Sequence, residues 1–247
     1  MNSTEFFSQL AEPFTGELVF DSLSDVVFFI KNARGEYVIV NQTLVKRCGF
    51  KQKAELIGRR PDQVFPLLLG QTYRNQDEQV LKSGQAILNQ LELHFYPLGS
   101  RGWCLTNKFP LRNLQGRVIG LAGVSRDLQT PNERSQDYSQ VAQTIKYIQT
   151  HYAEPLRVKD LAERAKLSDY QFEQRLRRIF QLTAGQIIQK TRMEAAITRL
   201  REGVFSIADV ALDCGYSDQS AFTRQFRQST GMSPTEYRRS VASELHC

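Results

Sequence analysis

Few side chains in this chain of 247 residues could carry out catalysis or bind a metal. The three histidines, His94, His151 and His246, have no nucleophile or carboxylate beside them in a recognisable catalytic pattern, and no glycine-rich loop could hold a phosphate. The four cysteines are scattered, without a Cys-x-x-Cys pair or a histidine at ligand spacing, which argues against zinc and against a disulfide framework. We therefore expect neither an enzyme nor a metal or cofactor site.

Side chains that could hydrogen-bond to a partner are concentrated in the second half of the chain, at helical spacing. Phe172 and Leu176 lie four residues apart, as do Phe222 and Phe226, so each pair marks the inward face of a helix. The outward faces then carry polar and basic side chains: Tyr170, Gln174 and Arg178 on the first helix, and Gln219, Ser220, Thr223, Arg224 and Arg227 on the second. Such groups can read base edges in a major groove, although a solvated helix face has the same pattern.

Signals for helix starts surround these two helices. Capping boxes, in which two side chains satisfy free backbone N–H groups, are predicted at Ser168, Thr183, Ser206 and Ser233. The segment 158–176 recurs loosely as 207–226, and in both copies a short apolar helix leads through a tight turn into a second helix. This pattern predicts two helix-turn-helix units in tandem; the alternative is an ordinary helical bundle whose repeat is accidental.

One helix is predicted between the two units, from Thr183 to about Arg201. At ~1.5 Å per residue, about 18 residues span roughly 27 Å. Successive major grooves on one face of B-DNA lie ~34 Å apart. A connector of this length could place both second helices in adjacent grooves.

Two stretches near the end of the chain carry a family resemblance. They are Ile207-Ala-Asp-Val-Ala-Leu-Asp-Cys-Gly-Tyr-Ser-Asp-Gln-Ser-Ala-Phe-Thr-Arg-Gln-Phe-Arg227 and Thr230-Gly-Met-Ser-Pro-Thr-Glu-Tyr-Arg238. Together they resemble the DNA-binding domain of the AraC/XylS (arabinose-regulator) family, which covers roughly the last hundred residues. The first unit departs more, because Gln181 stands where the family usually has glycine and Leu176 where it usually has an aromatic residue.

The resemblance implies a sequence-specific DNA-binding transcription regulator with two recognition helices in successive major grooves. It implies base readers at seven positions: Tyr170, Glu173, Gln174, Gln219, Ser220, Thr223 and Arg224. Five basic residues are expected to contact the DNA backbone: Arg177, Arg178, Lys190, Arg192 and Arg227. Double-stranded DNA is thus the expected partner, and RNA polymerase a second one.

The first half of the chain has a different hydrophobic period. Up to about Asp127 apolar residues tend to alternate, which predicts strands, whereas after about Ser139 they recur every three to four residues, which predicts helices. A polar stretch broken by Pro131 separates the two regions. We predict an α+β chain made of two domains and a linker: 1–128, 129–138 and 139–247.

The N-terminal domain carries three degenerate motifs: Asp25-Val-Val-Phe-Phe-Ile-Lys-Asn-Ala-Arg-Gly-Glu-Tyr-Val-Ile-Val-Asn41, Cys48-Gly-Phe with Ile57-Gly58, and Gly102–Gly120 followed by Val124-Ser-Arg-Asp127. They resemble a PAS domain, an antiparallel sheet with flanking helices. The alternative is the sugar-binding barrel of many AraC/XylS members. A PAS domain implies either sensing of a small-molecule effector or formation of a homodimer.

A ligand pocket in this domain is predicted at five residues, which could equally be core residues: Phe28, Tyr73, Leu93, Trp103 and Leu105. No flavin is expected, because Arg47-Cys48-Gly49 does not match an Asn-Cys-Arg-type motif. No haem is expected either, since His94 falls on a predicted strand rather than on the helix where haem-binding PAS domains usually carry their ligand.

The net charge and the N-terminal sequence indicate which partners and which cellular location to expect. The net charge of +6 and the isoelectric point near 9.2 favour acidic partners such as nucleic acid. The N-terminus lacks the pattern of a signal peptide, and no apolar run approaches the ~20 residues of a membrane span, so we expect a cytoplasmic protein that is not bound to a membrane. The alternative function is a sensor module that acts through protein partners, with the helical half as its interaction surface.

Overall fold

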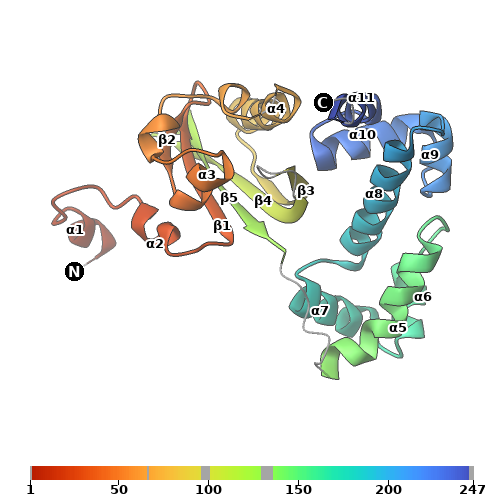
Figure 1. The fold of residues 1–247 in the computed structure, drawn as a ribbon. Coiled ribbons are helices and arrows are strands. Elements are labelled where there is room, and N and C mark those ends of the chain that lie inside the picture. Colours follow the sequence, from red (N-terminus) through yellow and green to blue (C-terminus); the bar gives the residue numbers. More distant parts are fainter. Residues whose placement is uncertain (1, 66, 96–100, 129–135, 245–247) are drawn as a thin grey trace. The chain divides into compact units, whose positions relative to one another are not determined.

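The computed structural model describes residues 2–65, 67–95, 101–128 and 136–244. The chain divides into two compact units, and the division falls after Asp127 (Figure 1). Most of the predicted linker lies outside the described residues, as do Pro131 and His246.

The first unit is built on a five-stranded sheet. Its strands lie in the order β2-β1-β5-β4-β3, and β1 pairs antiparallel with β2 and β5, as β5 does with β4. The bounds are β1 Val26–Asn32, β2 Tyr37–Val40, β3 Ile87–Phe95, β4 Arg101–Arg112 and β5 Val118–Asp127. With a helical second half, this sheet confirms the predicted α+β class.

Short helices accompany the sheet: α1 Ser3–Phe7, α2 Glu17–Asp21, α3 Gln42–Arg47, the 3₁₀ turns η1 Lys53–Glu55 and η2 Pro61–Gln63, and the longer α4 Leu67–Ser83. One apolar core joins the sheet to the helices. Phe29 and Leu121 of the sheet pack in it with Leu44 of α3 and Val80 of α4. Because successive strand residues point to opposite faces, this core fixes which strand positions face inward.

The inward face also buries charges. Lys31 of β1 and Lys108 of β4 both bind Asp77 of α4, with ammonium-to-carboxylate distances of 2.5 and 2.8 Å, and all three residues are almost completely buried. Lys108 also donates to the side-chain carbonyl of Gln76. Burial lowers the pKa of Lys31 to about 8, a shift that Asp77 partly opposes. Two ammonium groups therefore share one carboxylate in this cluster.

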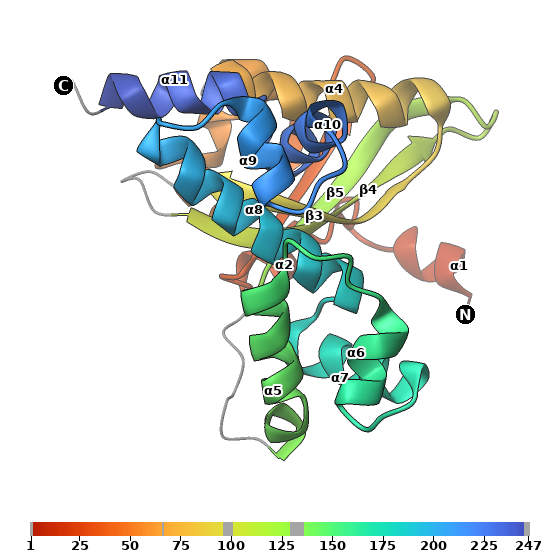
Figure 2. The same ribbon diagram turned by 90° about the vertical axis from the view of Figure 1, so that its right-hand side faces the viewer.

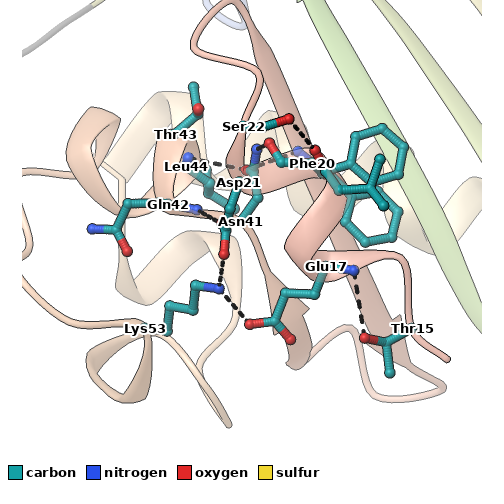
Figure 3. A network of polar contacts seen from close by, with 12 residues as sticks. Thr15, Glu17, Phe20, Asp21, Ser22, Asn41, Gln42, Thr43, Leu44 and Lys53 are labelled. Carbon is teal, nitrogen blue, oxygen red and sulfur yellow. Dashed lines mark hydrogen bonds and ion pairs between the residues drawn. The ribbon is translucent and has the colours of Figure 1, made fainter. Parts of the chain in front are cut away.

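The segment before β1 is attached by the polar network shown in Figure 3. The side-chain amide of Asn41 donates to the backbone carbonyls of Phe20 and Val26, at 3.0 and 2.7 Å. Lys53 forms ion pairs with Glu17 and Asp21 of α2. These contacts hold α2 beside β1 and the start of α3.

In the second unit, the described residues from 128 onward form only helices: α5 Gln136–His151, α6 Val158–Arg164, α7 Asp169–Phe180, α8 Ala184–Glu202, α9 Ile207–Asp213, α10 Gln219–Thr230 and α11 Pro234–Glu244. The pairs α6–α7 and α9–α10 are the two predicted helix-turn-helix units. Figures 1 and 2 show α5–α7 grouped around one end of α8 and α9–α11 around the other. Helix α5 begins at Gln136, earlier than the expected start near Ser139.

Local signals explain these helices. All four capping boxes form as predicted, at Ser168, Thr183, Ser206 and Ser233. Phe172, Leu176, Phe222 and Phe226 are fully buried, as the four-residue spacing indicated. At ~1.5 Å per residue the 19 residues of α8 span about 28 Å.

Candidate nucleic-acid interface

Helix α10 is held rigidly at both ends. The Asp218 carboxylate accepts a hydrogen bond of 2.7 Å from the backbone N–H of Ala221, which caps the helix start. Gly231 ends the helix with a φ of 82°, a left-handed conformation that glycine adopts without steric cost. The rings of Phe222 and Phe226 pack edge to face, 5.5 Å apart, on the inward side. A fixed helix with one buried face presents its other face in a defined geometry.

The outward face of α10 forms a shallow hollow of about 420 Å³, lined by Gln219, Ser220, Thr223, Arg224 and Arg227. These are the four predicted readers of the second unit together with one predicted backbone contact. Thr223 is half-buried and the other four side chains are exposed. Amide, hydroxyl and guanidinium groups on one surface supply donors and acceptors for base edges and phosphates.

Helix α7 presents a comparable face in the first helix-turn-helix unit. Tyr170 is 73% exposed, and Gln174 and Arg178 are exposed beside it, while Phe172 and Leu176 point inward. The three side chains predicted to form an outward stripe therefore do so. The end of this helix differs from that of α10, because Gln181, a non-glycine residue, occupies the left-handed position with a φ of 60°.

Glu173 is placed differently from the other predicted readers. It is half-buried, and its carboxylate accepts a hydrogen bond of 3.2 Å from the backbone N–H of Ala184, at the start of α8. Its second oxygen lies 4.0 Å from the guanidinium of Arg177. The carboxylate thus caps the connector helix, so the interpretation of Glu173 as a base reader does not fit its placement.

Two predicted backbone contacts on α8 also have protein partners. Lys190 forms an ion pair with Glu194 at 2.7 Å and keeps 30% of its side chain exposed. Arg192 donates to the backbone carbonyls of Tyr152 and Glu154, at 2.8 and 3.0 Å. The prediction that Arg192 contacts phosphate does not fit this placement, because its guanidinium is engaged within the protein by residues 40 and 38 positions away in the sequence.

The residues predicted to line a ligand pocket in the N-terminal domain are Phe28, Tyr73, Leu93, Trp103 and Leu105. Strand alternation separates them. Phe28 pairs with Val124, and Val124 with Asn107, so Leu105 shares the outer sheet face with Phe28. Tyr73 of α4 lies near the inward Lys108, whose ammonium is 5.8 Å from its ring centre. The five residues therefore do not converge on one pocket.

Two limits apply to the residues that the structure describes. None of their helices combines the length and apolar character needed to cross a membrane. No group of three or more histidine, cysteine, aspartate or glutamate side chains among them could hold a metal ion.

Two helix-turn-helix units, each with an exposed polar and basic face on its second helix, define a DNA-binding protein. A family model of a helix-turn-helix domain matches residues 161–240, and a model of the PAS fold matches residues 20–133. The PAS match favours the predicted PAS fold over the sugar-binding barrel.

Comparison with known proteins extends this result. Regulatory protein SoxS of Salmonella typhimurium is 31% identical over 102 residues, which are 41% of this chain and 95% of SoxS. The HTH-type transcriptional activator RhaR of Mannheimia succiniciproducens is 27% identical over 195 residues, 76% of this chain and 69% of RhaR. Among solved structures, the DNA-binding domain of AdpA in complex with a target DNA is 28% identical, with a TM-score of 0.41; the match covers 42% of this chain and 95% of that one.

The chain belongs to the AraC family of DNA-binding transcription regulators and carries a PAS domain in its N-terminal half. The resemblance that the sequence motifs implied is thereby confirmed.

Proposed function

We propose that this regulator reads DNA with α7 and α10 in two successive major grooves. The observation that carries the proposal is the duplicated unit: each recognition helix has a buried aromatic or aliphatic face and an outward polar face. The connector α8 spans about 28 Å. That length is comparable to the ~34 Å between successive major grooves on one side of B-DNA.

We propose different duties for the side chains of the two faces. In the second unit Arg224 would donate to a guanine and Gln219 would pair with an adenine, with Ser220 and Thr223 completing the contact. In the first unit the proposed readers are reduced to Tyr170 and Gln174, because Glu173 is engaged in the protein. Three exposed cations and the half-buried Lys190 would bind phosphates: Arg177, Arg178, Lys190 and Arg227.

The PAS unit is proposed to control this activity, through a small-molecule effector or through a homodimer. We place the domain limits at 1–128 and 139–247, so a short linker would transmit a change in the sheet to α5. A shift in the population of two arrangements would alter DNA affinity or contact with RNA polymerase. The protein would act in the cytoplasm as a regulator and not as an enzyme. Sedimentation velocity of the full chain, with and without DNA, measures the proposed dimer.

Selection of bound duplexes from a random-sequence pool, with the full chain as bait, tests the reading of DNA. We expect enrichment of a two-part site, with affinity that falls steeply as salt rises, because phosphate contacts release counterions. A pool that shows no enrichment, combined with no binding even at low salt where the phosphate contribution is largest, would contradict the proposal. That result would favour a sensor that acts through protein partners.

A further inference from the structure

Arg192 lies near the middle of α8 and touches the end of α5. Its guanidinium donates to the carbonyls of Tyr152 and Glu154, which follow the last turn of α5. Carbonyls at the end of a helix lack partners within the helix and carry partial negative charge, so a guanidinium there is favourable. Arg192 therefore binds the connector helix to the segment between α5 and α6, directly before the first helix-turn-helix unit.

The turn of the second unit reaches the same place. Gly215, between α9 and α10, approaches this segment so closely that a β-carbon on it would lie 2.8 Å from the carbonyl oxygen of Ala153 and 2.9 Å from that of Tyr152. Only a residue without a side chain fits at such distances from backbone atoms. Gly215 also has a φ of 78°, which glycine adopts readily.

Tyr216 connects the contacts around residues 152–154 with the interior of the second helix-turn-helix unit. Its ring centre lies 5.8 Å from the Arg192 guanidinium and 5.2 Å from the ring of Phe222. Phe222 in turn packs against Phe226, so an aromatic row leads from Arg192 to the buried side of the recognition helix α10.

We propose that Arg192, Gly215 and Tyr216, together with the 152–154 carbonyls, form a joint that fixes the orientation of one helix-turn-helix unit relative to the other. The joint sets the spacing that the protein accepts between its two half-sites. The inference rests on the proposed two-groove reading of DNA. A single connector helix leaves each unit free to rotate at its end, whereas a second attachment beside the helix removes that freedom.

Spacing dependence gives the sharpest test. One inserted base pair moves a half-site ~3.4 Å along the axis and rotates it by about 34–36°. On the best selected site and its one-base-pair insertion, we expect the wild-type full chain to lose affinity at least about tenfold. The Arg192→Ala chain should bind the best site more weakly but lose less than about threefold on insertion. An insertion penalty equal to that of the wild type would overturn the joint.

Matched variants separate the joint from other effects. Arg192→Lys can still donate to the carbonyls and should restore most of the spacing dependence. Lys190→Ala, two residues earlier on α8, should weaken binding equally at both spacings. Gly215→Ala should relax the spacing, whereas Gly203→Ala should not, because Gly203 has a similar φ of 75° but nothing within 4 Å of an added β-carbon. Equal behaviour of the two glycine variants would count against the close approach.

A distance measurement without DNA keeps the joint testable by itself. Spin labels at Glu163→Cys on α6 and Leu212→Cys on α9, both exposed positions, report the distance between the two helix-turn-helix units by electron double resonance. We expect one narrow distribution in the full chain and a broad one after Arg192→Ala. Identical distributions would overturn the joint. A wild-type chain that selects no two-part site would instead contradict the proposed function and leave this measurement as the test of the joint.

Discussion

The two units of this regulator treat charge in opposite ways. Every charged residue that is buried among the described residues lies in the sheet or in α4, and none lies after residue 128: Lys31, Asp77, Glu92 and Lys108. The second unit buries apolar helix faces, such as those of Phe172 and Phe226, and keeps its arginines at or near the surface.

This difference separates two uses of charge. A cation outside remains available to phosphates and base edges at little cost to the fold. A cation inside loses its hydration and depends on its partner, so the free energy of unfolding becomes sensitive to that partner and to pH. The first unit is thus the part of the chain whose stability responds to its charge state, and the second is the part whose charge meets DNA.

Removal of the shared carboxylate should have the largest effect. Asp77→Asn leaves the ammonium groups of Lys31 and Lys108 buried without an anion between them. Breaking a buried ion pair from one side costs about 3–5 kcal/mol of the free energy of unfolding. Urea unfolding followed by the fluorescence of Trp103, the only tryptophan in the chain, measures this loss in the first unit.

Glu78→Gln is the matched control for Asp77→Asn. Glu78 is the next residue of α4 and pairs with Arg74 and Lys82 at the surface. Its loss should be much smaller, because exposed pairs contribute little. Equal losses for the two variants would show that the inside–outside distinction is wrong.

An exposed cation should matter for DNA and not for the fold. Arg224→Ala should weaken specific binding by roughly 1–3 kcal/mol and relax preference at one base pair, with an unchanged unfolding midpoint. Binding to the selected site and to each single-base variant of it gives both quantities. Arg227→Ala is the control, since loss of a phosphate contact weakens all sequences alike. A uniform loss for Arg224→Ala would reassign Arg224 to the backbone.

Stability of the first unit should rise between pH 7 and pH 9. Burial lowers the pKa of Lys31 to about 8, whereas in the unfolded chain it stays near 10.5. Across this window the folded state binds fewer protons than the unfolded state, so the free energy of unfolding increases, by about 1 kcal/mol.

Lys31→Met isolates that contribution, because it leaves Asp77 paired with Lys108. The unfolding free energy of the wild type minus that of the variant should increase, in favour of the wild type, as pH rises from 7 to 9. Cys48, which faces Lys31, has a pKa raised to about 12 by burial and is present in both proteins. A difference that is constant with pH would contradict the titration of Lys31.

The smallest expected effect concerns the helix ends of the two recognition helices. Gln181 has a left-handed φ of 60° at the end of α7, whereas Gly231 has a φ of 82° at the corresponding end of α10. Relief of this strain is partly offset by the greater freedom of glycine in the unfolded chain, so Gln181→Gly should stabilise the second unit by about 0.5 kcal/mol. Circular dichroism at 222 nm during urea unfolding measures it. Gly231→Ala should destabilise the second unit. A destabilising Gln181→Gly, or a stabilising Gly231→Ala, would contradict the equivalence of the two helix ends.

Local signals in the sequence were sufficient for much of the second unit. Capping boxes and the spacing of Phe222 and Phe226 act over three or four residues, so they could be predicted directly. The outward set on α10 followed from the same spacing. The partners of Glu173 and Arg192 could not be predicted in this way. The donor to Glu173 lies 11 residues away in the sequence, and an acceptor of Arg192 lies 40 residues away.

The first unit shows which signal was overlooked. The pocket set mixed residues of both sheet faces because the register between strands is not visible in the sequence. The alternation Val27, Phe29, Lys31 did place Lys31 on the core side of β1, and this signal could have identified a buried lysine. Its partner Asp77 on α4 depends on tertiary packing and could not have been inferred locally.

Methylation of guanine N7 by dimethyl sulfate, on the selected site with and without the full chain, tests the central claim most directly, because this atom lies in the major groove. The account predicts two protected segments about 10 base pairs apart on one face of the duplex, one for each recognition helix. In the Arg224→Ala chain, protection should weaken in one segment alone. Protection confined to a single segment in the wild type would contradict reading by two helices.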